Sequence, residues 1–133
     1  MDTESTVRRV IEAYDRQDAD AVGALLSDEL RYRINARPET GRYCATTEGK
    51  ADFFAAIQPI LDDWEVASYK LGDLIVSGER AAAQIDLTLR SRHRADHVFV
   101  GNLALFLTVV EGKITEIVEY HDTASAKTAR SGW

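Results

Sequence analysis

The sequence predicts an α+β domain in which three helices pack on one face of a strongly curved, mostly antiparallel sheet. Two amphipathic segments open the chain, a third apolar helical segment follows a long loop, and the remainder alternates like strands joined by short turns. With 133 residues, the chain is expected to form a single domain, 1–133. An apolar share of 45% is ordinary for a globular protein, so a packed core is expected.

The first two elements are expected to be helices. Apolar side chains recur at the i, i+3, i+4 and i+7 spacing of one helix face, at Val7, Val10, Ile11 and Tyr14. This helix should end near Gln17, and Asp18 can then cap a second helix. The apolar stripe of the second helix consists of Val22, Leu25 and Leu26. Residues 30–34 alternate between apolar and charged side chains and predict a strand.

A long loop and a third helix are expected next. Residues 37–48 predict a loop, and loops of this length in small domains often form a pocket wall or a lid. Apolar residues at helical spacing mark the third helix, at Phe53, Phe54, Ile57, Ile60, Leu61 and Trp64. Pro59 lies inside this pattern and cannot donate to the carbonyl of Ala55, so a kink or an early end is expected.

The rest of the chain predicts an antiparallel meander. Its four strands are expected at residues 67–76, 80–91, 97–109 and 112–123. The first two flank Ser77-Gly78-Glu79, which is a hairpin signal. A polar turn at 92–96 and the turn at Glu111-Gly112 join the others.

Charge and composition argue against several kinds of partner. The formal net charge of -6 argues against a nucleic-acid partner, because phosphate binding needs a basic surface. No apolar stretch approaches the roughly 20 residues of a membrane span, so no membrane partner is expected. Cys44 is alone, so neither an intrachain disulfide nor a cysteine metal cluster is predicted, and no metal is expected. The acidic start lacks the apolar run of a signal peptide, and a cytoplasmic protein is expected.

The closing strand brings a carboxylate to each of its faces. Because successive strand side chains point to opposite sides, one face should carry Thr115, Ile117, Glu119 and His121. The other face should carry Glu116, Val118, Tyr120 and Asp122. One of these faces should look into a cavity, where a carboxylate is costly unless it is partnered or used. Glu119 is therefore a candidate general base, and a glutamate in solvent is the alternative.

A second carboxylate lies on the strand at 80–91, which has one polar and one apolar face. Asp86 alternates with Gln84 and Thr88, and the opposite face carries Ile85, Leu87 and Leu89. If the polar face lines the cavity, Asp86 and Glu119 could share a proton. If the polar face meets solvent, the apolar face forms the core. The sequence leaves both arrangements open.

Other residues are candidates to line a substrate pocket, namely Tyr14, Trp64, Asn102, Ala104, Ile117 and His121. On strict alternation Asn102 shares a face with Ala104, where its amide could orient a carbonyl group or a water. His121 lies on the Glu119 face and could relay a proton, since histidine titrates between about pH 5 and 8. Core packing is the alternative for Tyr14 and Trp64, and a place on the rim is the alternative for His121.

Two stretches of the chain, Tyr14–Glu29 and Gly112–Asp122, resemble the NTF2-like superfamily. The first is similar to the opening pair of helices in that superfamily, with an aromatic residue, a polar turn ending in Asp and an apolar stripe. The second is similar to the last strand of SnoaL-like and ketosteroid-isomerase-related members. The resemblance implies a cone-shaped fold with a pocket inside. It implies the fold more strongly than a function, because this fold hosts enzymes, binding modules and transport factors.

The resemblance allows a comparison with ketosteroid isomerases residue by residue. These enzymes use a tyrosine in the first helix, an aspartate base on the first strand and a protonated aspartate on a later strand. Here the three positions fall at about Val10, Ile34 and Ala104. None of these side chains can transfer a proton, which argues against steroid isomerisation.

Two other enzyme groups match better. Limonene-epoxide hydrolases use an aspartate–arginine–aspartate arrangement whose positions fall at Glu119, Gln84 and Asp86. Tyr32 matches a further tyrosine of that group, and Asn35 lies one residue out of register with its asparagine. Glutamine in place of arginine supplies no charge, which argues against epoxide hydrolysis by that route. SnoaL-type polyketide cyclases rely on one acidic residue of the last strand, and it falls at Glu119.

These observations predict a small, cofactor-independent enzyme that acts by acid–base catalysis on a hydrophobic, oxygen-bearing small molecule, in a cyclase-like or isomerase-like reaction. Glu119 is the expected base, with Asp86 and Gln84 as its partners and Tyr32 as a donor. The alternative is a binding module without chemistry that holds a small apolar ligand or a partner protein. The resemblance also implies a homodimer through the outer face of the sheet.

Overall fold

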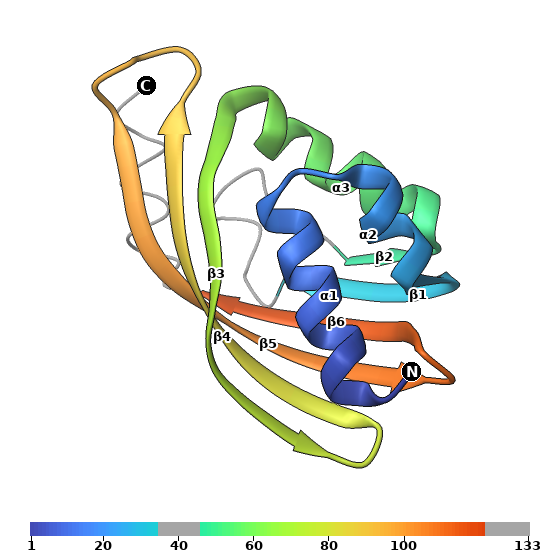
Figure 1. The fold of residues 1–133 in the computed structure, drawn as a ribbon. Helices are drawn as coiled ribbons and strands as arrows, with labels where there is room; N and C mark the ends of the chain where they lie inside the picture. The colour runs from blue at the N-terminus through green and yellow to red at the C-terminus, as the bar shows by residue number, and fades with distance from the viewer. Residues whose placement is uncertain (35–45, 122–133) are drawn as a thin grey trace.

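A computed structural model describes residues 1–34 and 46–121, and its elements follow the expected order (Figure 1). The helices are α1 (Thr3–Asp15), α2 (Ala19–Leu25) and α3 (Lys50–Asp63). The strands are β1 (Leu26–Ile34), β2 (Thr46–Glu48), β3 (Trp64–Ser77), β4 (Arg80–Ser91), β5 (Val98–Val110) and β6 (Lys113–His121).

The strands form one six-stranded sheet with the order β2-β1-β6-β5-β4-β3. Neighbouring strands are antiparallel except β1 and β6, which run parallel. The sheet bends strongly, and the three helices lie on its concave side (Figure 1). The predicted architecture, three helices on a curved and mostly antiparallel sheet, is confirmed.

Side-chain caps explain where the first two helices begin. The Asp2 carboxylate accepts the backbone N–H of Ser5 at 2.7 Å and starts α1. The Asp18 carboxylate accepts the N–H of Ala21 at 3.0 Å and starts α2, as expected. Between the helices Gln17 adopts a positive φ of 57°, which reverses the chain after α1.

The third helix continues further than its proline suggested. α3 runs through Pro59 to Asp63, so the expected early end is wrong. The proline removes only one backbone donor, and the buried side chains of Phe53 and Ile57 hold the helix against the core. Of the expected loop at 37–48, residues 46–48 form strand β2 beside β1, and the remainder up to residue 45 lies outside the described residues.

The core fills the space between the helices and the concave face of the sheet. Its most deeply buried large side chains are Leu26, Leu30, Ile85, Leu107, Ile114 and Val7. Apolar residues of the inner faces of β1, β4, β5 and β6 thus meet the apolar stripe of α1. Among the described residues, no helix combines the length and apolarity that crossing a membrane requires.

Among the irregularities in strand pairing, one in β3 and one in β6 change which side chains near the pocket face this core. In β3, Val66 pairs with Leu89 but Ser68 pairs with Thr88, so Ala67 is an extra residue. In β6, Ile114 pairs with Val109 but Glu116 pairs with Thr108, so Thr115 is extra. Each extra residue reverses the alternation that follows it. Ile114 and Ile117 are consequently both buried, and Thr115 does not share the Ile117 face as strict alternation predicted.

Candidate functional site

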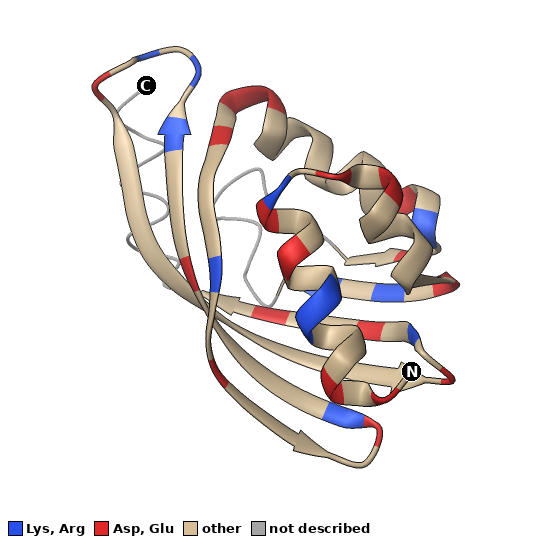
Figure 2. Cartoon of the chain, in the orientation of Figure 1, with Lys and Arg blue, Asp and Glu red and all other residues tan. Residues whose placement is uncertain are grey.

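A pocket of about 160 Å³ opens between the helices and the concave face of the sheet. Its walls are mainly apolar, with Val10 and Ile11 from α1, Phe53 and Ile57 from α3, and leucines from β4 and β5. Figure 2 shows β5 without a charged residue along its length, and Phe99, Leu103, Leu105 and Leu107 of this strand line the pocket. The ionisable side chains in the lining are Tyr14, Tyr32, Tyr69, Glu119 and His121.

Glu119 is the carboxylate of this pocket. It lies on β6 opposite Ile34 of the parallel strand β1, which brings Tyr32 of β1 close to it. The Tyr32 hydroxyl donates to Oε1 of Glu119 at 3.3 Å. The Glu119 side chain is 16% exposed, so a hydrogen-bonded but little-hydrated carboxylate faces an apolar cavity.

His121 lies beside the second oxygen of the same carboxylate. Strand alternation puts it on the Glu119 face, and its Nδ1 is 3.3 Å from Oε2 of Glu119. This Nδ1 is buried, and its geometry toward Oε2 is not that of a hydrogen bond. A protonated imidazole here forms an ion pair with Glu119, so His121 can exchange a proton with the carboxylate after a small reorientation.

Three tyrosines line the same pocket as the carboxylate, and all three resist ionisation. Burial raises the pKa of Tyr32 and of Tyr69 well above 10, and the negative charge of Glu119 raises both further. The same two causes, in the same order, raise the pKa of Tyr14. At neutral pH each of these side chains is therefore a neutral phenol that can donate a hydrogen bond.

Six of the ten predicted site residues line the pocket, namely Glu119, Tyr32, Trp64, Ile117, His121 and Tyr14. The other four do not. Asp86 pairs with Asn102 and Gln84 pairs with Ala104 between β4 and β5, and all four side chains are exposed on the outer face of the sheet. The expected partnership of Asp86 and Gln84 with Glu119 is therefore corrected, as are the expected pocket positions of Asn102 and Ala104.

The physical reason is the burial of the opposite face of β4. Ile85 is fully buried and Leu87 lines the pocket, so the apolar face of this strand meets the core. Turning the polar face inward would bury the Asp86 carboxylate and the Gln84 amide away from water, which is costly. Asn35, which the epoxide-hydrolase comparison singled out, and Asp122 lie outside the described residues.

Tyr69 is a pocket residue that the sequence pattern did not identify. Strict alternation from Trp64 and Val66, which both line the pocket, sends Tyr69 to the outer face. The extra residue Ala67 turns it inward instead. No turn residue or proline marks this bulge in the sequence.

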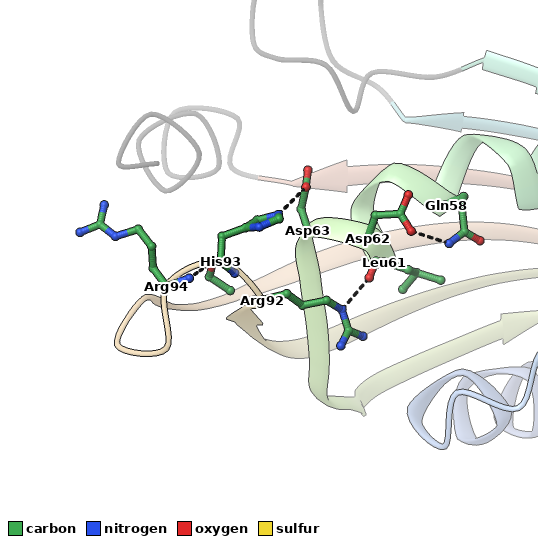
Figure 3. A network of polar contacts seen from close by, with 8 residues as sticks. Gln58, Leu61, Asp62, Asp63, Arg92, His93 and Arg94 are labelled. Atoms are coloured by element: carbon green, nitrogen blue, oxygen red, sulfur yellow. Dashed lines mark hydrogen bonds and ion pairs between the residues drawn. The ribbon is translucent and has the colours of Figure 1, made fainter.

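A polar network anchors the end of the pocket where α3 meets β3 (Figure 3). Nε2 of His93 lies 3.0 Å from Oδ1 of Asp63, and Nε of Arg92 donates to the carbonyl of Leu61 at 2.8 Å. These contacts tie the connection between β4 and β5 to the end of α3. Trp64, which follows Asp63 and lines the pocket, packs edge-on against His97 from the same connection.

Within residues 1–34 and 46–121, no group of three or more acidic, histidine or cysteine side chains could hold a metal ion.

Comparisons with known proteins agree with this architecture. A family model described as SnoaL-like domain matches residues 7–117. An NTF2-like protein from Burkholderia thailandensis has a similar structure, with a TM-score of 0.85 and 18% sequence identity, over 98% of this chain and 98% of that one. None of the curated proteins matches the chain.

Two further solved structures carry provisional enzyme names. One, provisionally named a polyketide cyclase, from Pseudomonas putida, has a TM-score of 0.77 and 22% identity over 97% of this chain and 98% of that one. The other, provisionally named an isomerase, from Rhodopseudomonas palustris, has a TM-score of 0.79 and 16% identity over 96% of this chain and 93% of that one. At these identities the likeness concerns the fold.

Proposed function

This chain belongs to the SnoaL-like domain family, and from that premise we propose that it is a small enzyme that moves a proton on an apolar, oxygen-bearing molecule, with Glu119 as the base. The observation that supports this most is the carboxylate itself. It is held by Tyr32, lies beside His121 and faces an otherwise apolar pocket. A carboxylate that only stabilised the fold would have no reason to face a cavity.

The proposed reaction is proton transfer next to a carbonyl group. Glu119 takes a proton from the carbon beside the carbonyl, the C–H electron pair forms the double bond of an enolate, and the negative charge moves to the oxygen. Return of the proton to another carbon isomerises the molecule. Alternatively, the enolate carbon attacks a second carbonyl: a C–C bond forms, the C=O π bond opens to an alkoxide, and protonated Glu119 returns its proton to that oxygen, as in an aldol cyclisation. Neither outcome needs an additional electron donor or acceptor.

Hydrolysis of an epoxide ranks lower. That reaction needs a second carboxylate and a positive charge between the two. The positions expected to supply them, Gln84 and Asp86, lie on the outer face of the sheet. A reaction that uses Glu119 alone fits the side chains that do face the pocket.

Glu119→Gln tests the proposal directly. The measurement is hydrogen–deuterium exchange, followed by NMR in D2O, on a panel of small enolisable ketones that includes acetophenone. We expect wild-type protein to accelerate exchange of the protons beside the carbonyl, and Glu119→Gln to lower that rate by about 10²–10⁴-fold. Ligand affinity should be retained, because glutamine keeps the shape and the hydrogen-bonding capacity of the side chain.

Glu116→Gln is the matched control, since Glu116 lies on the same strand and its carboxylate pairs with exposed Arg31 instead. This control should exchange protons like wild type. If wild-type protein binds the ketones but accelerates no exchange, the catalytic proposal fails and a binding module without chemistry takes its place.

A further inference from the structure

Tyr14 and Tyr69 meet in the wall of the pocket although they come from distant parts of the chain. Tyr14 lies near the end of α1 and Tyr69 lies on the edge strand β3. Their ring centroids are 4.5 Å apart, with 52° between the ring planes, and both residues line the pocket. Two phenol side chains are thus presented to one small cavity.

Their hydroxyls differ from that of Tyr32 in one respect. Tyr32 donates to Glu119, whereas neither Tyr14 nor Tyr69 has a hydroxyl hydrogen bond to any described residue. A buried phenol in an apolar pocket gains from a hydrogen-bond acceptor. A bound molecule that brings an acceptor oxygen to this wall supplies one.

The two phenols also lie within electrostatic range of the base. Burial first, and then the charge of Glu119, raises the pKa of both side chains, and Tyr14 further raises the pKa of Tyr69. Both therefore remain protonated donors at neutral pH. Two phenol donors and a carboxylate base that line one pocket describe a site for a carbonyl oxygen and its neighbouring C–H group.

Contacts on the backbone side hold the pair in place. Asp15 follows Tyr14, and its Oδ1 accepts the backbone N–H of Tyr69 at 2.9 Å. Its Oδ2 pairs with Nζ of Lys70 at 2.6 Å. The last residue of α1 is thereby joined to the segment of β3 that the bulge at Ala67 turns toward the pocket. The donors are positioned before a ligand arrives, which is how a site for developing charge works best.

We propose that Tyr14 and Tyr69 form a donor pair that binds the carbonyl oxygen of the ligand, so that the pocket selects small ketones or aldehydes over hydrocarbons of the same shape. This inference deepens the proposed function and rests on it for the role of Glu119. The pocket volume of about 160 Å³ suits a compact molecule, because a cavity of about 150 Å³ in another protein holds benzene. In the reaction, the same two donors stabilise the oxygen of the enolate.

The test compares two probes of equal shape, acetophenone and α-methylstyrene, in which a C=CH2 group replaces the C=O group. Wild-type protein should bind acetophenone more tightly, by about twofold to tenfold for each hydrogen bond. Tyr69→Phe and Tyr14→Phe should each lower acetophenone affinity by that factor and leave α-methylstyrene affinity unchanged. Tyr120→Phe, a matched change on the exposed outer face, should leave both affinities unchanged.

Wild-type protein gives a second readout that needs no variant. The infrared C=O stretch of bound acetophenone should move to lower frequency than in an apolar solvent, because both donors weaken the carbonyl bond. Glu119→Gln should keep the preference for the ketone while losing proton exchange. A variant that still prefers the ketone but no longer exchanges protons would show that ketone binding does not depend on the base Glu119.

Equal wild-type affinity for the two probes, or an unshifted C=O stretch, would overturn the donor pair and leave the role of Glu119 standing. Binding of neither probe would overturn the donor pair together with the proposed function. A ketone preference that survives in both Tyr14→Phe and Tyr69→Phe would assign the donor role to another group and overturn the inference as well.

Discussion

Three phenols around one carboxylate determine what can ionise in this pocket. Glu119 is the acceptor of the cluster, and its negative charge opposes ionisation of Tyr14, Tyr32 and Tyr69. The three tyrosines therefore keep their protons at neutral pH and act as hydrogen-bond donors.

The raised tyrosine pKa values predict a loss of stability in alkali. Below about pH 10 the tyrosines are protonated in both the folded and the unfolded chain. Above it the unfolded chain releases these protons while the folded pocket keeps them, so the free energy of unfolding falls as pH rises. Urea titrations at increasing pH should show this decline, and tyrosinate absorbance should rise together with unfolding.

The double variant Tyr14→Phe/Tyr69→Phe should flatten that decline, since it removes two of the groups that cause it. Tyr120→Phe should not, because Tyr120 is exposed. Tyrosines of the pocket that ionise near pH 10 in a chain still folded would contradict the expectation.

At the scale of the elements, two single-residue bulges decide what the pocket contains. Ala67 reverses the alternation of β3 as far as Leu71, so that Tyr69 points inward, and Thr115 lets both Ile114 and Ile117 face the core. A bulge thus acts as a local switch between two faces of a strand. The same strands without these residues would present a different set of side chains to a ligand.

The two isoleucines of β6 should respond differently to truncation. Ile114 is fully buried in the packed core, so Ile114→Ala should lower the free energy of unfolding by about 2–5 kcal/mol. Ile117 lines the existing pocket, so Ile117→Ala enlarges a cavity that is already there and should cost about 2 kcal/mol or less. Urea denaturation of both variants measures the difference. An equal or larger loss for Ile117→Ala would contradict this account.

The bulges also mark where prediction from the sequence ended. Helix periodicity, the Asp18 cap and the meander are local patterns, and the structure follows them. Alternation alone predicts that Glu119 and His121 share a face, and the structure agrees because both residues follow the bulge of β6. The sequence does not decide which face of the strand that carries Asp86 is buried, because alternation separates the two faces of a strand without showing which of them meets the core. Tyr69 was missed because an extra residue inside a strand leaves no local signature.

At the scale of the whole molecule, the outer face of the sheet is unusually apolar for an exposed surface. Ile75, Ala82, Phe106 and Val118 occupy neighbouring register positions across four strands. Ile75 is 70% exposed and Phe106 is 41% exposed, and the Phe106 ring packs edge-on against Tyr120. A continuous apolar stripe of this kind is typical of a contact surface, which keeps the expected homodimer a reasonable prediction.

Phe106→Glu tests that prediction. We expect wild-type protein to be a dimer in solution and the variant to be a monomer, because two copies of a new carboxylate would be buried near the symmetry axis of the interface. Light scattering coupled to size-exclusion chromatography gives the mass of each. Ala55→Glu, a matched change on the exposed side of α3, should leave the mass unchanged. A wild-type monomer would show that the stripe does not join two copies.

The place of β6 in the sheet has a consequence for the order in which the molecule assembles. β6 lies between β1 and β5, so it alone joins the β2–β1 pair to the β5–β4–β3 meander. During synthesis, β1 and β5 cannot pair with β6 until residues 113–121 have been made. Those residues also bring Glu119 and His121. Completion of the sheet and arrival of the acid–base pair are thus a single event, and a partly made chain has neither.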